Sequence, residues 1–330
     1  GGVRYTHETK DSYFVQPFIS PAFTGAWIQG RVTPGNQTFD NWSPEATLSW
    51  KPMQGILVYA AYKTAYKSGG FSNGGIDSAF GNAAQDLVFN PEKARGFEGG
   101  IKTELLDRQL RINLGVYRYD YKDLQVDFFN STIIAFQTLT ADARTKGVEL
   151  EFEYAPRSLD GFNLHCSLNY NKAAYTKFPL APCYGGQTAA EGCNLAGGTR
   201  QSLNGAPLSV APKWVGSFGV SYDTAVGNGL MGGLSIDSRF SSSYLVSGFG
   251  NPDSRQSKYG VIDASLRIGA EDDNWQVALV GKNLTNKLYV TGGVDGPNTP
   301  LASSPAGTHA DQMGFGSLPR TVQLQLTKTF

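Results

Sequence analysis

The chain has 330 residues with 28 basic and 28 acidic side chains, and only 17% of its residues are charged, against about 25% in soluble domains. A chain without net charge has no general attraction for nucleic acid, and its apolar runs are shorter than the roughly 18 residues that a membrane helix needs. Forty glycines, many aromatic residues and the lack of helical periodicity predict an all-β protein whose surface lies only partly in water.

The first predicted strand begins near residue 3, because Val3 and Tyr5 alternate with polar residues. So abrupt a start predicts that this is a piece of a longer protein. A polar segment with glycine and proline, up to about Asn41, is interpreted as the first connection. Further strands with a period of two are predicted at residues 42–50, 56–67, 92–105, 110–122, 147–154, 162–171, 213–222, 230–241, 262–268, 275–279 and 321–330.

The faces of these strands differ in polarity. In the last strand Val322, Leu324 and Leu326 alternate with uncharged polar residues. In the strand that ends at residue 154, a row of carboxylates that includes Glu149 and Glu151 alternates with apolar residues. Such a row would face water in a soluble protein or a wet lumen in a wide barrel.

The strand at 110–122 changes phase. Leu114 and Val116 lie on its apolar face, whereas Tyr117, Tyr119 and Tyr121 lie on the opposite one. Either a β-bulge turns the strand at this point, or the strand leaves a membrane there and the tyrosines lie in the interface.

The connections alternate between short turns and long polar loops, which is the layout of outer-membrane barrels. A soluble all-β array or propeller would carry Lys and Glu on its outward faces, where this chain has Leu, Val, Phe and Ile. Aromatic residues also gather near the strand ends, as interface belts require. They are Tyr59, Tyr62, Tyr66, Tyr117, Tyr119, Tyr121, Tyr154, Tyr170, Trp214 and Tyr222.

Several segments resemble motifs of TonB-dependent outer-membrane receptors. They are the Pro-Glu…Glu-x-Gly-x-Lys segment at 91–102, the tyrosine-rich strand at 117–126, the Gly-Val-Glu-x-Glu element at 147–151 and the Asn-Leu-x-Asn-Lys-x-Tyr signature at 283–289. The strand from Arg320 to Phe330 resembles the C-terminal strand that the barrel-assembly machinery reads. Lys328 departs from that pattern, because the family usually has an apolar or aromatic residue there.

The resemblance implies an antiparallel transmembrane β-barrel of 22 strands around a plug. About twelve strands are present here, and residues 1–330 would be the C-terminal part of the barrel, without the plug domain, the TonB box or the first strands. Such receptors bind a scarce ligand, most commonly a ferric siderophore, and import it with energy from TonB. The implied partners are TonB, the barrel-assembly machinery, outer-membrane lipid and lipopolysaccharide, and a small-molecule ligand. No cofactor, metal or catalysis is implied.

Two sets of candidate site residues follow. Charged and polar residues on the inward faces are expected to line the lumen, namely Glu98, Lys102, Glu149, Glu151, His165, Lys213, Asp237 and Arg239. Residues in the long loops are candidates for ligand contact, namely Phe71, Phe80, Tyr184, Phe249, His309 and Phe315. The alternative for the aromatic ones is that they pack the loops together. Phe330 is the candidate assembly signal.

The cysteines fit an oxidising compartment. Cys183 and Cys193 share one long loop, and a disulfide across it is expected. Cys166 lies on the apolar face of its strand and is interpreted as a small lipid-facing residue.

Two rival functions remain at this stage. Outer-membrane phospholipases are twelve-stranded and use a Ser-His pair on the barrel exterior, for which only His7, His165 and His309 are available. By parity His7 faces outward and His165 inward, and no motif flanks either residue. A passive porin in a smaller closed barrel would need an open lumen with rings of charge.

Overall fold

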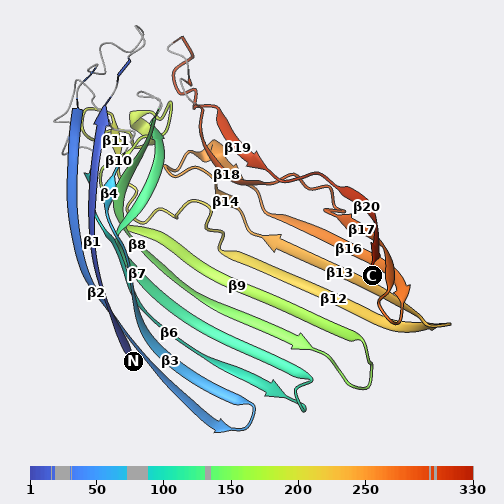
Figure 1. The fold of residues 1–330 in the computed structure, drawn as a ribbon. Helices are drawn as coiled ribbons and strands as arrows, with labels where there is room; N and C mark the ends of the chain where they lie inside the picture. The colour runs from blue at the N-terminus through green and yellow to red at the C-terminus, as the bar shows by residue number, and fades with distance from the viewer. Residues whose placement is uncertain are drawn as a thin grey trace.

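The computed structural model describes residues 1–15, 17–18, 30, 32–72, 88–130, 135–296, 299–300 and 303–329. Its main element is one curved antiparallel sheet of twelve strands, which confirms the predicted all-β class and the number of strands (Figure 1). The strands of the main sheet lie side by side in the order in which they occur along the chain, from β1 to β20. Within the described residues no helix is long and apolar enough to cross a membrane.

The strands of the main sheet agree in position with the predicted ones. They are β1 (Gly2–Val15), β2 (Val32–Met53), β3 (Ile56–Lys67), β6 (Glu92–Leu105), β7 (Leu110–Asn130), β8 (Ala135–Tyr154), β9 (Phe162–Lys177), β12 (Trp214–Gly227), β13 (Leu230–Ser241), β16 (Tyr259–Ala270), β17 (Trp275–Lys282) and β20 (Thr321–Lys328).

In the described parts of the long connections there are four small hairpins and two single-turn 3-10 helices. These are β4 (Gly70–Phe71) with β5 (Val88–Phe89), β10 (Ala181–Pro182) with β11 (Arg200–Gln201), β14 (Tyr244–Leu245) with β15 (Arg255–Gln256), β18 (Val290–Asp295) with β19 (Gln312–Gly316), η2 (Ala189–Glu191) and η3 (Pro252–Ser254). The hairpins gather at one end of the main sheet and the short turns lie at the other (Figure 1).

The first connection is shorter than predicted. β1 and β2 stay paired from Gly2 opposite Glu45 as far as Val15 opposite Val32, so much of the polar segment before Asn41 is strand. Polar residues occupy both faces of the hairpin there, and the alternation that reveals a strand in the sequence is therefore lost. The backbone ladder continues nonetheless, because it depends on the neighbouring strand and not on the side chains.

The register of the sheet lines up residues of one kind on each face. Leu114, Leu150 and Leu168 are consecutive partners across β7, β8 and β9, and they define what we call the outward face. Asn113 and Glu151 pair on the opposite, inward face. Large apolar side chains on the outward face are exposed along the whole sheet. Examples are Leu48, Phe97, Leu114, Val116, Phe218, Leu266, Leu279 and Leu324.

The phase change in β7 has a clear structural reason. β6 and β7 remain in one register through this region, with Gly99 opposite Val116 and Glu98 opposite Tyr117. A bulge occurs only later, between Tyr121 and Leu124. The strand therefore does not turn at residue 117; its outward face changes from apolar to charged, as expected where a strand leaves a membrane.

The tyrosines of that strand were placed wrongly in the predicted interface belt. Tyr117 pairs with the inward-facing Glu98, and Tyr119 and Tyr121 follow it at steps of two residues, so all three tyrosines face inward. Tyr59 faces inward as well, opposite Gly100 of β6. Three other aromatic pairs do lie on the outward face. They are Tyr5 with Trp42, Tyr62 with Phe97, and Tyr170 with Trp214, with ring centroids 4.7, 5.0 and 4.8 Å apart.

Candidate functional site

The inward face is a polar wall in which charged groups are paired across strands. Lys63 Nζ lies 2.5 Å from Glu98 Oε1, and the Tyr119 hydroxyl donates to Glu98 Oε2 at 2.7 Å. Lys102 Nζ lies 5.8 Å from the ring centre of Tyr59, which is within cation–π range. A half-exposed wall of this kind suits a water-filled lumen and not a lipid environment.

A cavity of about 250 Å³ opens on this wall between β3, β6, β7 and β8. Four tyrosines and two carboxylates line it, namely Tyr59, Tyr117, Tyr119, Tyr121, Glu98 and Glu149. The sequence prediction named the two carboxylates and missed the tyrosines. Parity places Tyr117, Tyr119 and Tyr121 opposite the apolar face of their strand, but only the cross-strand register shows that they lie beside Glu98 and Glu149.

The second half of the wall carries His165 and Asp237. His165 Nε2 lies 3.3 Å from Asp237 Oδ1, across the intervening strand β12. Gly219 is the strand residue between them, and a Cβ added to it would lie 2.3 Å from the imidazole and 2.5 Å from the carboxylate. Glycine at this position therefore allows the two side chains to meet above the strand.

The remaining lumen candidates are placed as follows. Glu151 accepts a hydrogen bond from Asn113 Nδ2 at 3.0 Å. Arg239 lies 3.8 Å from Asp263, on the inward face. Lys213 is exposed but precedes β12 and belongs to no strand of the sheet. Within the described residues, no group of three His, Cys, Asp or Glu side chains is arranged to hold a metal ion.

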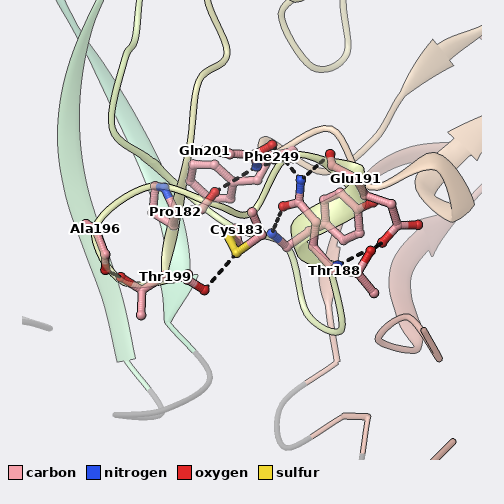
Figure 2. The surroundings of a disulfide bond; sticks show 12 residues. Pro182, Cys183, Thr188, Glu191, Ala196, Thr199, Gln201 and Phe249 are labelled. Carbon is pink, nitrogen blue, oxygen red and sulfur yellow. Dashed lines mark hydrogen bonds between the residues drawn. A yellow bond between two sulfur atoms is a disulfide. The ribbon is translucent and has the colours of Figure 1, made fainter. Parts of the chain in front are cut away.

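Three long connections pack together at the loop end of the sheet, and we call residues 181–201, 244–256, 290–296, 299–300 and 303–316 the loop assembly. Cys183 and Cys193 form a disulfide in the first of them, with 5.7 Å between their Cα atoms (Figure 2). The amide of Gln201, which is buried, donates to the carbonyls of Pro182 and Phe249 at 2.8 and 2.9 Å. Gln201 thus joins the disulfide loop to the neighbouring connection.

The carboxylate of Asp295 joins all three connections. It accepts hydrogen bonds from the Gly185 N–H at 2.8 Å, from Asn251 Nδ2 at 3.1 Å and from Gln312 Nε2 at 2.9 Å. Asn251 is fully buried, so its amide has no access to water as an alternative partner. Asp295 is not among the predicted site residues, because no motif near it in the sequence marks it.

His309 makes a second junction in the loop assembly. Its Nδ1 lies 2.7 Å from Asp253 and its Nε2 lies 2.9 Å from Glu191, and its side chain is only 16% exposed. The hydrogen bonds to Glu191 and Asp253 raise the pKa of His309. Hydrogen bonds from Thr188 and then His309 lower the pKa of Glu191 to about 2. The junction is therefore an ion-paired cluster when His309 is protonated.

The aromatic ligand candidates fall into two groups. Tyr184 and Phe249 are buried and belong to a cluster with Tyr175, Phe178 and Leu203, so they pack the loops together. Phe71 lies against β2 at Gly35. Phe315 is 79% exposed on β19 and remains available to a ligand. Phe80 and Phe330 lie outside the described residues.

The three histidines contact carboxylates. His7 faces outward and its Nδ1 lies 2.8 Å from Asp40, while His165 contacts Asp237 and His309 contacts Asp253 and Glu191. In the part of the chain that the structure describes, none of the three imidazoles is hydrogen-bonded to a serine hydroxyl. The geometry gives no support to a Ser-His catalytic pair.

Comparison with known proteins agrees with this architecture. The family model "TonB dependent receptor-like, beta-barrel" matches residues 1–284. The metal-pseudopaline receptor CntO of Pseudomonas aeruginosa is 30% identical over 123 residues, which are 37% of this chain and 16% of that protein. The probable TonB-dependent siderophore receptor PiuA of Acinetobacter baumannii is 22% identical over 179 residues, 54% of this chain and 22% of the relative.

Solved structures show the same fold. The ferric yersiniabactin uptake receptor FyuA from Yersinia pestis superposes with a TM-score of 0.67 and 18% identity, and the match covers 98% of this chain and 42% of FyuA. PiuA superposes with a TM-score of 0.65, covering 98% of this chain and 39% of PiuA. This chain therefore spans less than half the length of the relatives it matches. It belongs to the TonB-dependent receptor family, and residues 1–284 match the β-barrel of that family.

Proposed function

We propose that this protein binds a scarce metal chelate of the ferric siderophore type at its loop assembly and imports it across the outer membrane with energy supplied through TonB. The observation that carries the proposal is the combination of a two-faced sheet with a cross-linked set of long loops at one end. A ligand-binding surface needs ordered loops on a rigid scaffold, and Asp295, His309 and the disulfide supply that order.

The relatives support the ligand class. CntO is named as a receptor for metal-pseudopaline, PiuA as a probable siderophore receptor and FyuA as an uptake receptor for ferric yersiniabactin. On this chain the exposed ring of Phe315 is the candidate that a ligand could stack against. The polar inward wall with Glu98, Lys102 and Glu149 would border the path that the chelate takes.

Further parts of the proposal concern assembly and partners. All of residues 1–330 would belong to the barrel wall, and TonB would act through a region outside them. The C-terminal strand would be the segment that the barrel-assembly machinery reads, ending in Phe330. The protein would bind and gate its ligand without catalysing a reaction.

An uptake assay tests the proposal. Cells that lack their other chelate receptors would express the protein and receive a panel of radiolabelled ferric siderophores and other metal chelates. We expect accumulation of at least one chelate, with loss of uptake when TonB is deleted or the proton gradient is collapsed. Uptake that continues without TonB would indicate a passive porin, and no uptake of any chelate would contradict the proposed substrate class.

A further inference from the structure

Another cavity opens on the inward face of the sheet, on the side of the long loops. Its volume is about 370 Å³, and it lies over the neighbouring strands β9, β12, β13 and β16 (Figure 1). The register places Ser167, Ser217, Arg239 and Val261 in one row across these four strands. Small-molecule sites in proteins have volumes of about 300–1,000 Å³, so the cavity is large enough for a ring with its substituents.

Arg239 brings a positive charge to this cavity. Its side chain is 58% exposed, and its guanidinium lies 3.8 Å from the Asp263 carboxylate. That carboxylate accepts the Asn283 N–H at 2.7 Å and lies 3.5 Å from Lys282 Nζ, so its charge is already compensated. Asp237, two residues earlier on the same strand, contacts an imidazole. Among the described residues no group accepts a hydrogen bond from the Arg239 guanidinium, and its donors are available to an anion.

Two serine hydroxyls face the same cavity. Ser167 Oγ and Ser217 Oγ lie 2.8 Å apart and share one hydrogen bond. Only one of the two hydroxyl hydrogens is used in that bond, and the other can be donated to a ligand. Ser217 is the direct strand partner of Arg239. A carboxylate bound to the guanidinium would therefore lie beside a hydroxyl donor.

The side of the cavity towards the long loops is aromatic. The rings of Tyr259 and Tyr289 are stacked, with their centroids 4.2 Å apart and an angle of 9° between their planes. The buried Tyr244 donates its hydroxyl hydrogen to the Val290 carbonyl at 2.7 Å, and the Ser317 N–H donates to the Tyr289 carbonyl at 2.7 Å. These bonds hold the backbone on both sides of the stack. The stacked pair is thus a fixed apolar surface against which a third ring can pack.

Val210 lines the cavity in a strained backbone conformation. Its φ is 50°, which lies in the left-handed region and is unfavourable for a β-branched residue. Its N–H donates to the Leu245 carbonyl at 2.8 Å, and the residue is 47% exposed. Strained residues are found preferentially at binding sites and ligand clamps. The strain therefore marks this cavity independently of its charge.

We propose that the cavity binds a planar aromatic ring that carries a carboxylate, as one arm of the imported chelate. Arg239 would bind the carboxylate through paired, charge-assisted hydrogen bonds, the serine pair would add a hydroxyl donor, and the ring would pack against the tyrosine stack. Tyr244 and Thr291 line the cavity and belong to the loop assembly, so the arm would bind where the loop assembly meets the inward wall. The inference rests on the proposed function, because it assigns one part of the chelate to a site beside that assembly.

Small metal-free acids test the site without transport. Binding of para-fluorobenzoate to the purified protein in detergent would be followed by fluorine NMR, with benzoate, benzamide and cyclohexanecarboxylate as competitors. We expect benzoate to bind with a Kd of about 1 mM and benzamide, which lacks the charge, to bind about tenfold more weakly. Cyclohexanecarboxylate, which lacks the flat ring, should bind several-fold more weakly. Equal competition by the three compounds, or no binding of the fluorinated acid, would overturn the proposal.

Two variants locate the binding. Arg239→Gln should weaken benzoate binding about tenfold and keep the preference for the flat ring, whereas Tyr289→Leu should remove the preference for benzoate over cyclohexanecarboxylate. The matched control is Arg108→Gln, which removes the same charge from a turn where the side chain is 82% exposed, and it should bind as the wild type does. Unchanged benzoate binding by Arg239→Gln would overturn the site.

The competition series needs only the wild-type protein, so it decides the proposal even if a variant folds poorly. Chelate uptake is not part of either readout. Failure of the benzoate experiment therefore leaves the proposed function to its own test, and failure of uptake leaves the benzoate result standing.

Discussion

The main sheet and the loop assembly are held together by different kinds of contact. Each strand of the sheet pairs with the strand next to it, and the face on which a residue lies follows from its parity. In the loop assembly, Asp295 and His309 bind residues that are 17 to 118 positions away in the sequence. The same pairing between adjacent strands is thus repeated across the sheet, whereas the loop assembly depends on a few side-chain contacts between distant residues. Breaking one contact should therefore have different consequences in the two regions.

The largest effect is expected on the outward face of the sheet. Leu150→Arg would place a charge in the apolar band, at a cost of about 2–4 kcal/mol in unfolding free energy. Glu151→Arg, the next residue of β8, would place the same side chain on the inward face, where water is available. The measurement is the unfolding free energy of each variant in lipid bilayers. Equal losses for the two variants would contradict the assignment of the faces.

The disulfide is expected to matter only within the loop assembly. Replacing Cys183 and Cys193 by serine removes a cross-link that is worth about 3 kcal/mol for a loop of this length. Hydrogen exchange should become faster for residues between the two positions and stay unchanged in β8. Faster exchange in both regions would mean that the disulfide also stabilises the sheet.

Asp295→Ala should loosen three connections together. The substitution removes the acceptor of the Asn251 amide, which is fully buried, at an expected cost of about 1–3 kcal/mol. The matched control is Asp311→Ala, an exposed carboxylate of the same connection. Hydrogen exchange should accelerate around Gly185, Asn251 and Gln312 in the first variant only. If only the segment around residue 295 responds, Asp295 does not join the connections.

The smallest effect is a dependence on pH. Because its pKa is raised, protonated His309 stabilises the junction fully below the ordinary histidine value of 6.5, and this contribution is lost as the pH rises through the raised pKa. Glu191, with its pKa lowered to about 2, contributes above the ordinary value of 4.5 and loses its contribution as the pH falls towards 2. The junction should be tightest between these two ordinary values.

Hydrogen exchange of residues 184–192 across this pH range, after correction for the intrinsic rate, would measure the effect. We expect several-fold faster local opening above the raised pKa of His309. His309→Gln should remove most of the pH dependence above 6.5, because glutamine does not titrate. A wild-type profile that is flat from pH 5 to 9 would contradict the ion-paired junction.

The sequence predicted the parts of the molecule that follow a local rule. The period of two placed Leu150 and Glu151 on opposite faces, and two cysteines in one loop suggested their pairing. It also placed twelve strands, although it missed the extension of β1 and β2, where both faces are polar and no alternation is left to detect.

The candidate site was less accessible to prediction. Tyr184 and Phe249 were candidates for ligand contact, but they are buried in the hydrophobic cluster with Tyr175, Phe178 and Leu203. Their burial results from the packing of segments that are distant in the sequence. No motif in the sequence around Asp295 marks it as a residue that joins loops. The inward tyrosines around Glu98 required the register between β6 and β7, which depends on the pairing of whole strands.

Accessibility along one strand tests the central claim most directly. Single cysteines at residues 148 to 152 of β8, in a background with Cys166→Ser, would carry a spin label in intact outer membranes. Labels at Val148, Leu150 and Phe152 should respond to a lipid-soluble relaxation agent, and those at Glu149 and Glu151 to a water-soluble one. This alternation is what a wall between lipid and a wet lumen requires. Uniform exposure of all five positions to the water-soluble agent would contradict it.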